Sequence, residues 1–291
     1  MAGEPRLPPG RVVELPGRGT TFVRELPGPT GAPTVVLLHG WTVTADLNWF
    51  PSYAALGEHF RVVAVDHRGH GRGLRPTGPF RLADCADDLA ALVEVLDLDR
   101  VILAGYSMGG PVAMLTWYRH RDVVDGLVLC ATAPIFRGAG GNRVSGRTLP
   151  YLVRAARLAP LPLQRVIARE LLGRRFARDD FGQWARRQLS LGDPLTIAEA
   201  GPSIGRFDAH AWLADIDVPT SVLRTLHDRI VPLHRQTRLA EQIPGAELFD
   251  VDGDHRVCVS DAPEFVPQLV AAARSVGSRL PDRYHADRTE P

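Results

Sequence analysis

Ser107 lies at the centre of a glycine-flanked motif, Gly-Tyr-Ser-Met-Gly, at residues 105–109. An apolar run at 101–104 precedes the motif and is long enough for one buried strand, and a helical pattern follows at 111–120. Glycines allow a strand and a helix to approach closely around a tight turn, so that the serine hydroxyl projects at the end of the sheet. The start of the following helix favours negative charge beside it. Gly-x-Ser-x-Gly also recurs by chance, but this strand and helix context predicts a nucleophile elbow.

Acyl transfer by a serine needs a base, a carboxylate that orients the base, and donors for the oxyanion. The base would be a histidine, and His255 follows a strand-like run at 247–251. Asp228 follows a second run at 222–226. Because ligand sites in open α/β sheets form at the carboxyl ends of the strands, we expect Ser107, Asp228 and His255 to meet there.

Three other aspartates lie near His255 in the sequence and compete with Asp228 as the orienting carboxylate. Asp254 adjoins His255, but adjacent residues rarely place a carboxylate on the far nitrogen of the imidazole. Asp250 and Asp252 are interpreted as loop groups. The sequence therefore favours Asp228.

The other histidines near these motifs are interpreted as structural or surface groups. His39 is expected to hold its loop by hydrogen bonding. His67 and His70 lie in a glycine-rich loop without a carboxylate cluster, which is poor evidence for zinc. His227 and His234 are expected at the surface or beside the site. The sequence therefore predicts no metal and no other cofactor.

Strand-like apolar runs alternate with helical patterns through most of the chain. The runs occupy residues 34–38, 61–65, 101–104, 126–130, 219–224 and 247–251. Helical patterns occupy residues 49–60, 82–98, 111–120 and 262–276, and two alternating segments at 11–15 and 21–26 suggest an edge hairpin. Strands that are apolar throughout and alternate with helices indicate a parallel sheet covered on both faces.

Residues 135–215 interrupt this alternation, because they contain no strand-like run. It contains helical stretches at 149–158, 163–172 and 181–191. Gly and Pro, among them Pro194, Gly201 and Pro202, are expected to break the segment into short helices, and it carries 13 Arg against 7 Asp plus Glu. An insertion that leaves the carboxyl edge of the sheet is expected to lie over Ser107 and to wall the substrate pocket. A peripheral subdomain that docks a partner is the alternative. Five tryptophans could line an apolar pocket or belong to the core: Trp41, Trp49, Trp117, Trp184 and Trp212.

Several motifs in order resemble those of the α/β-hydrolase family over most of residues 20–275, least specifically at 135–215. They are His-Gly-Trp at 39–41, Asp-His-Arg-Gly-His-Gly at 66–71, the serine motif continued to Gly110, Asp-Arg-Ile-Val-Pro at 228–232 and Gly-Asp-His at 253–255. Gly73 departs from the pattern, since many members have serine there; the position is interpreted as structural.

The resemblance implies a mostly parallel central sheet flanked by helices, with an inserted helical cap. The core would comprise 1–134 and 216–276, the cap 135–215, and a disordered tail 277–291. It also implies Ser107 as nucleophile, His255 as general base and acid, and Asp228 as the residue that orients the imidazole. The backbone N–H groups of Trp41 and Met108 would form the oxyanion hole.

Composition excludes several other classes of function. The 291-residue chain has a net charge of +1, so no global field recruits nucleic acid or an anionic membrane. All 34 basic residues are arginine, which excludes a Schiff-base lysine and a Walker-type phosphate loop. The three cysteines are far apart, and residues 1–19 contain no apolar run of the kind found in signal peptides or membrane anchors. We therefore expect a cytoplasmic protein.

The sequence thus predicts a serine hydrolase that resembles carboxylesterases and lipases and acts on a small, apolar acyl substrate. A serine at the elbow argues against the dehalogenases and epoxide hydrolases of this fold, which use aspartate. Thioesterase, acyltransferase, perhydrolase and C–C bond hydrolase activities would use the same triad, and the fold does not choose among them. A non-catalytic ligand receptor is the alternative from another class, against which a complete triad argues. A homodimer is compatible with the sequence.

Overall fold

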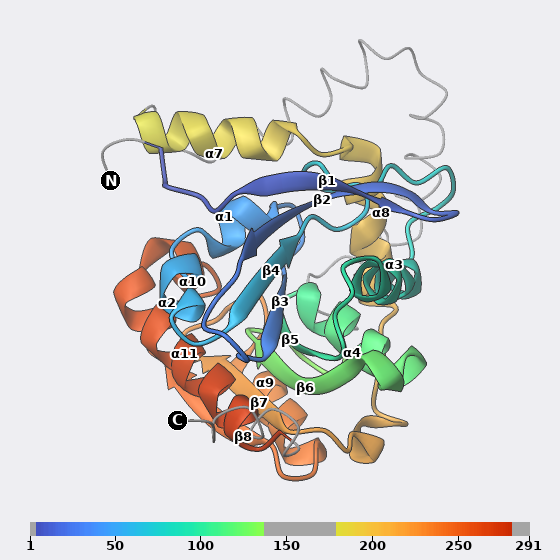
Figure 1. Ribbon diagram of the computed structural model, residues 1–291. Coiled ribbons are helices and arrows are strands. Elements are labelled where there is room, and N and C mark those ends of the chain that lie inside the picture. The colour runs from blue at the N-terminus through green and yellow to red at the C-terminus, as the bar shows by residue number, and fades with distance from the viewer. Residues whose placement is uncertain (1–3, 137–178, 281–291) are drawn as a thin grey trace.

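The computed structural model describes residues 4–136 and 179–280 and has one eight-stranded sheet at its centre (Figure 1). The strand order is β1-β2-β4-β3-β5-β6-β7-β8. The strands are β1 Gly10–Leu15, β2 Gly19–Leu26, β3 Thr34–Leu38, β4 Arg61–Val65, β5 Val101–Tyr106, β6 Val124–Cys130, β7 Thr220–Thr225 and β8 Glu247–Val251. β2 pairs antiparallel with β1 and with β4, and all other pairs are parallel. The predicted, mostly parallel α/β sheet is therefore confirmed.

Helices cover both faces of the sheet. The α-helices are α1 Ala45–Trp49, α2 Tyr53–Gly57, α3 Leu82–Val95, α4 Gly109–Arg119, α7 Asp180–Ser190, α8 Pro194–Gly205, α9 Leu233–Gln242, α10 Val257–Ser260 and α11 Ala262–Ser278. Buried side chains of α3, α4 and α9 form one apolar cluster with the sheet, and those of α1, α2 and α11 form another. Strands β5 and β6 are buried along their whole length between these layers, as expected for the central strands of a parallel sheet.

Two predicted helical boundaries were wrong, and proline explains both. The helix predicted at 49–60 is only the short α2, Tyr53–Gly57, and a separate helix, α1, ends at Trp49. Pro51 lies between the two helices and cannot donate a helical hydrogen bond. In the cap, Pro194 was expected to break the chain but occupies the first turn of α8, where proline is tolerated. Gly201 and Pro202 were also expected to be breaks, yet they lie inside that helix.

The described part of the predicted cap comprises residues 135–136 and 179–215. It contains α7, α8 and the 3₁₀ helix Leu213–Asp215. Its one β-type pairing among the described residues is an isolated antiparallel bridge between Ile135 and Asp208, which joins its two ends. The helices predicted at 149–158 and 163–172 lie outside the described residues. The predicted start of a disordered tail at residue 277 was too early, because α11 continues to Ser278 and Leu280 is buried. Residues 281–291 lie outside the described residues.

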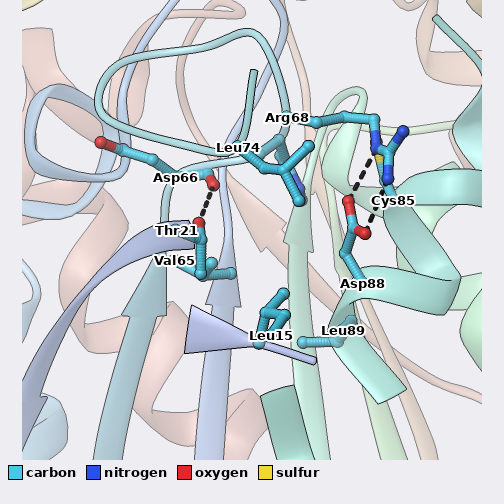
Figure 2. A pocket seen from close by; sticks show the side chains of 10 residues that line it. Leu15, Thr21, Val65, Asp66, Arg68, Leu74, Cys85, Asp88 and Leu89 are labelled. Atoms are coloured by element: carbon cyan, nitrogen blue, oxygen red, sulfur yellow. Dashed lines mark hydrogen bonds and ion pairs between the residues drawn. The ribbon is translucent and has the colours of Figure 1, made fainter. Parts of the chain in front are cut away.

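The first residues of the glycine-rich loop at 66–71 line one side of a small cavity of about 20 Å³, enough for one water molecule, and β1, β2 and α3 line the rest (Figure 2). Figure 2 shows Arg68 paired with Asp88 at 2.7 Å, while Thr21 donates to the Asp66 carbonyl at 3.1 Å. The backbone doubles back so tightly that a Cβ at Gly73 would overlap the backbone of Asp66. Gly73 therefore has the structural role expected of it.

Three buried histidines pack together where this loop meets the end of β3. The ring of His39 lies 4.4 Å from that of His67 and 5.3 Å from that of His70, between centroids. Nδ1 of His39 donates to the Gly40 carbonyl at 2.7 Å, which leaves Nε2 to accept the His67 N–H at 2.9 Å. This arrangement holds two loops together. Burial lowers the pKa of His39 to about 4 and that of His70 to about 3, and it lowers the pKa of His67 well below 6.5.

This cluster predicts an acid-sensitive fold. Each folded-state pKa is below the unfolded value of about 6.5, so the unfolded chain binds more protons once the pH falls below that value. The stabilisation is complete above pH 6.5 and is lost below it, at roughly 1.4 kcal/mol per pH unit for each histidine. Urea unfolding between pH 5.5 and 7.5 should therefore show a free energy of unfolding that falls by up to roughly 4 kcal/mol per pH unit below pH 6.5.

Two variants test the assignment. His70→Gln should reduce the pH slope by about one third, because one of three titrating groups is removed. His234→Gln removes an exposed histidine of α9 and should leave the slope unchanged. A free energy of unfolding that does not vary over this pH range would contradict the prediction.

Candidate active site

Ser107 occupies the turn between β5 and α4 in a strained backbone conformation. Its φ of +51° lies in the left-handed region that L-residues other than glycine rarely adopt. A Cβ at Gly105 would overlap the backbone of Gly109, and a Cβ at Gly109 would overlap the Leu38 carbonyl. The two glycines therefore allow the close contact between strand and helix that the sequence predicted. Two hydrogen bonds hold the turn. The Ser107 N–H donates to the Cys130 carbonyl at 2.9 Å, and the Thr132 hydroxyl donates to the Ser107 carbonyl at 2.8 Å.

His255 lies between Ser107 and Asp228. Its Nε2 is 2.9 Å from the Ser107 Oγ, and its Nδ1 is 2.7 Å from the Asp228 Oδ2. The Asp228 carboxylate is fully buried and accepts the Nδ1 proton, so Nε2 is left free to accept the serine proton. The three residues follow β5, β7 and β8, whose carboxyl ends lie along one edge of the parallel sheet. The structure thus brings together the three residues that the sequence singled out.

The fold and this geometry agree with a comparison at the level of sequence families. The model of the α/β-hydrolase fold family matches residues 33–262. The chain belongs to this family. The eight-stranded sheet, in which only β2 runs against the other strands, is accordingly an α/β-hydrolase core.

Individual relatives of this α/β hydrolase span nearly its whole length. A protein from Agrobacterium fabrum, provisionally named as the carbamate hydrolase RutD, is 31% identical over 251 residues, which are 82% of this chain and 92% of that protein. A pimeloyl-(acyl-carrier protein) methyl ester esterase from Chromobacterium violaceum is 30% identical over 249 residues, or 81% of this chain and 92% of the esterase. The crystal structure of an enol-lactonase from Burkholderia xenovorans superposes with a TM-score of 0.73 at 25% identity, covering 91% of this chain and 100% of the lactonase.

Hydrogen-bond donors hold both oxygens of the buried Asp228 carboxylate in this hydrolase. Oδ1 of Asp228 accepts the backbone N–H groups of Ile230 and Val231, each at 2.8 Å. Oδ2 accepts the Thr225 hydroxyl at 2.8 Å besides the imidazole. Gln236 of α9 donates to that hydroxyl oxygen at 2.9 Å and to the Val231 carbonyl at 2.7 Å. Sequence reasoning missed Gln236, because nothing in a polar helical segment marks one glutamine as buried.

The competing aspartates are engaged elsewhere. Asp254 pairs with Arg256 at 3.0 Å, Asp250 with Arg224 at 2.8 Å, and Asp252 with the exposed His227 at 2.7 Å. The backbone N–H and guanidinium of Arg256 lower the pKa of Asp254, and none of the three contacts the imidazole Nδ1. Asp228 alone, among the described residues, holds the orienting position.

Met108 is next to Ser107 in sequence, and Trp41 belongs to a loop that lies against Ser107. Met108 directly follows Ser107 and begins α4, with its side chain buried. The loop after β3 passes so close to the nucleophile that a Cβ at Gly40 would lie 3.5 Å from the Ser107 Cβ. Within the described residues, no hydrogen bond uses the backbone N–H of Trp41 or of Met108. Both donors are therefore available to a bound group.

The tryptophans divide between core and site. Trp49 and Trp117 are fully buried in the core, Trp184 of α7 packs against Phe50 beside α1, and Trp212 stacks on Tyr118 at the far end of α4. Trp41 alone of the five is substantially exposed, at 41%. It is the tryptophan beside the site.

Neither a metal centre nor a membrane segment is found in the described part of the chain. No three histidine, cysteine, aspartate or glutamate side chains of residues 4–136 and 179–280 are grouped as a metal site would require. Across the same residues, no helix combines the length and the apolar character needed to span a bilayer.

Proposed function

We propose that this protein is a serine hydrolase that cleaves carboxylic esters through an acyl-enzyme intermediate. The observation that carries the proposal is the unbroken chain of hydrogen bonds from Ser107 Oγ through His255 to the buried Asp228, at 2.9 and 2.7 Å. The esterase relative from Chromobacterium violaceum and the enol-lactonase of similar structure both carry names that refer to ester chemistry, which supports the choice of bond.

The reaction proceeds in two halves. His255 Nε2 takes the Ser107 proton as Oγ attacks the ester carbonyl, and the resulting imidazolium is stabilised by the Asp228 carboxylate. The N–H groups of Trp41 and Met108 donate to the oxyanion of the tetrahedral intermediate. His255 then protonates the leaving alcohol. Water, deprotonated by His255, attacks the acyl-enzyme, and Ser107 regains its proton as the acid departs.

The substrate that we propose is a small molecule with an apolar acyl group, bound between the sheet edge and the cap. The contact between Trp41 and the cap helix α8 supports this position, since it brings the cap against the loop beside Ser107. We also propose that the protein works in the cytoplasm. Its three cysteines are free and buried, as is typical of proteins in a reducing compartment.

A fluorophosphonate probe tests the proposal directly. The purified protein should be labelled once, and mass spectrometry of the digest should place the adduct on the peptide that contains Ser107. The labelled protein should lose its activity toward p-nitrophenyl esters, and a panel of rising acyl length should reveal the preferred chain. A protein that binds these esters but neither hydrolyses them nor reacts with the probe would be a ligand receptor, and the proposal would fail.

A further inference from the structure

The loop that follows β3 carries a strained residue next to Trp41. Thr42 has a φ of +67°, and a β-branched residue in the left-handed region is an outlier that the surrounding structure must impose. The side of the loop nearest the sheet is held by Asn48, whose Oδ1 accepts the Gly40 N–H at 2.9 Å. His39 Nδ1 donates to the Gly40 carbonyl at 2.7 Å, on the same side. Both bonds are made to Gly40, and the strained Thr42 lies beyond them, on the far side of Trp41.

The indole of Trp41 attaches this part of the loop to helix α8. Its Nε1 donates to the Ile197 carbonyl of α8 at 2.6 Å, across 156 positions of sequence. Ile197 and Gly201 are four residues apart and therefore lie on one face of the helix. A Cβ at Gly201 would lie 2.9 Å from the indole Cζ2 and 3.0 Å from Cη2, closer than ordinary contact allows. The ring therefore rests on α8 at two points, one polar and one where glycine leaves room.

Helix α8 is itself fixed to the hydrolase core. At its start, the Asp193 N–H donates to the Gly69 carbonyl at 2.8 Å, and Arg75 donates to the Leu191 carbonyl at 2.6 Å. One turn further along, Glu199 accepts the Phe80 N–H at 3.1 Å. The indole is thus attached to a helix that cannot shift without breaking contacts to the core.

We propose that the Trp41 side chain is a positioning residue for the oxyanion hole, an inference that rests on the proposed serine hydrolase function. The bonds from Asn48 and His39 hold Gly40 on one side of the Gly40–Trp41 peptide, and the indole on α8 holds Trp41 on the other. The N–H of that peptide is the donor that Trp41 offers to the oxyanion. The cap helix therefore sets the direction in which a core loop points its donor, in addition to any contact it makes with substrate.

Two substitutions loosen this attachment from opposite sides. Trp41→Phe keeps an aromatic ring but removes the indole N–H, and Gly201→Ala places a methyl group where the ring lies. Because loss of a whole oxyanion donor costs about 10²–10³ in kcat, a displaced donor should cost about tenfold. We expect that loss in kcat for both p-nitrophenyl acetate and p-nitrophenyl butyrate, with KM nearly unchanged. The rate of fluorophosphonate labelling should fall by a similar factor, because the phosphoryl oxygen uses the same donors.

Trp212→Phe is the matched control. This tryptophan stacks on Tyr118 at the end of α4 remote from Ser107, so its replacement should leave kcat and the labelling rate unchanged. The pH profile of kcat should also be unchanged in Trp41→Phe, since the imidazole and its carboxylate are untouched. Thermal unfolding of each variant shows whether it folds; if Gly201→Ala does not, Trp41→Phe carries the test alone.

The outcomes separate this inference from the proposed function. A Trp41→Phe variant with wild-type kcat and a raised KM, or with an effect on only one ester, would make the indole a wall of the binding pocket and would overturn the inference alone. Wild-type labelling rates in that variant would overturn it too. Wild-type protein that is not labelled at Ser107 would overturn the proposed function, and this inference with it.

Discussion

Replacement of Ser107 by alanine should reduce kcat for ester hydrolysis by about 10⁶-fold and abolish fluorophosphonate labelling. The loss is this large because the three groups act as a unit: without the serine oxygen no acyl-enzyme forms, and the proton transfers of His255 have no covalent step to assist. The fold should survive. The hydroxyl faces the imidazole, and the turn itself is held by backbone groups, including the Ser107 N–H bound to Cys130.

Steady-state kinetics with p-nitrophenyl acetate measures the loss, and circular dichroism shows whether the variant is folded. Ser278→Ala is a suitable control, because this exposed serine is the last residue of α11 and its hydroxyl donates to the Ser275 carbonyl, remote from Ser107. It should keep wild-type kcat and wild-type labelling. If Ser107→Ala hydrolyses the ester at the wild-type rate, or still binds the probe covalently, Ser107 is not the nucleophile.

Replacement of Asp228 by asparagine should lower kcat by about 10⁴-fold while the geometry of the site is retained. Both carboxylate oxygens accept hydrogen bonds, with two backbone N–H groups on Oδ1 and the Thr225 hydroxyl and His255 on Oδ2. Asparagine has one oxygen, which the two N–H groups will take. Its amide NH₂ then faces the imidazole and donates to Nδ1. The proton of the neutral ring then resides on Nε2. Nε2 can therefore no longer accept the serine proton.

Asp254→Asn is the matched control, since it makes the same chemical change one residue from His255. Asp254 pairs with Arg256 rather than with the imidazole, so kcat should stay within about twofold of wild type, as for other exposed ion pairs. Stopped-time assays at pH 7.5 are sufficient for both variants. An equal loss in the two would mean that the negative charge near His255 matters and the hydrogen bond from Nδ1 does not.

The central sheet could be predicted because its inner strands are buried on both faces, which makes each of them a nearly continuous apolar run. Such a run is bounded by polar or turn-forming residues, and Thr34–Leu38 and Arg61–Val65 accordingly have the predicted bounds. The site followed from the sheet, since a parallel sheet brings the residues after β5, β7 and β8 to one edge. Short motifs at strand ends were therefore sufficient to find Ser107, Asp228 and His255.

The elements that sequence reasoning missed are held by tertiary contacts. Helix α9 has few apolar residues and packs on the sheet through Gln236, Leu239 and Ala240. Helix α8 contains Gly201 and Pro202, which local propensity treats as breaks. Gly201 leaves room for the indole of Trp41, which no local pattern connects to it. Contacts of this kind decide where a helix continues, and they are invisible until the chain is folded.

The hydroxyl of Tyr106 donates to the backbone carbonyl of His255 at 3.1 Å, and the two rings lie 5.8 Å apart. Ser107 and His255, 148 positions apart in sequence, are therefore also connected through the peptide bond between Tyr106 and Ser107, the Tyr106 side chain and one hydrogen bond. The distance between Ser107 and His255 is therefore set by this short connection and not by the polypeptide that lies between them in sequence. The cap lies within those intervening residues, so it can gain, lose or exchange residues during evolution while the spacing of the reactive pair is preserved.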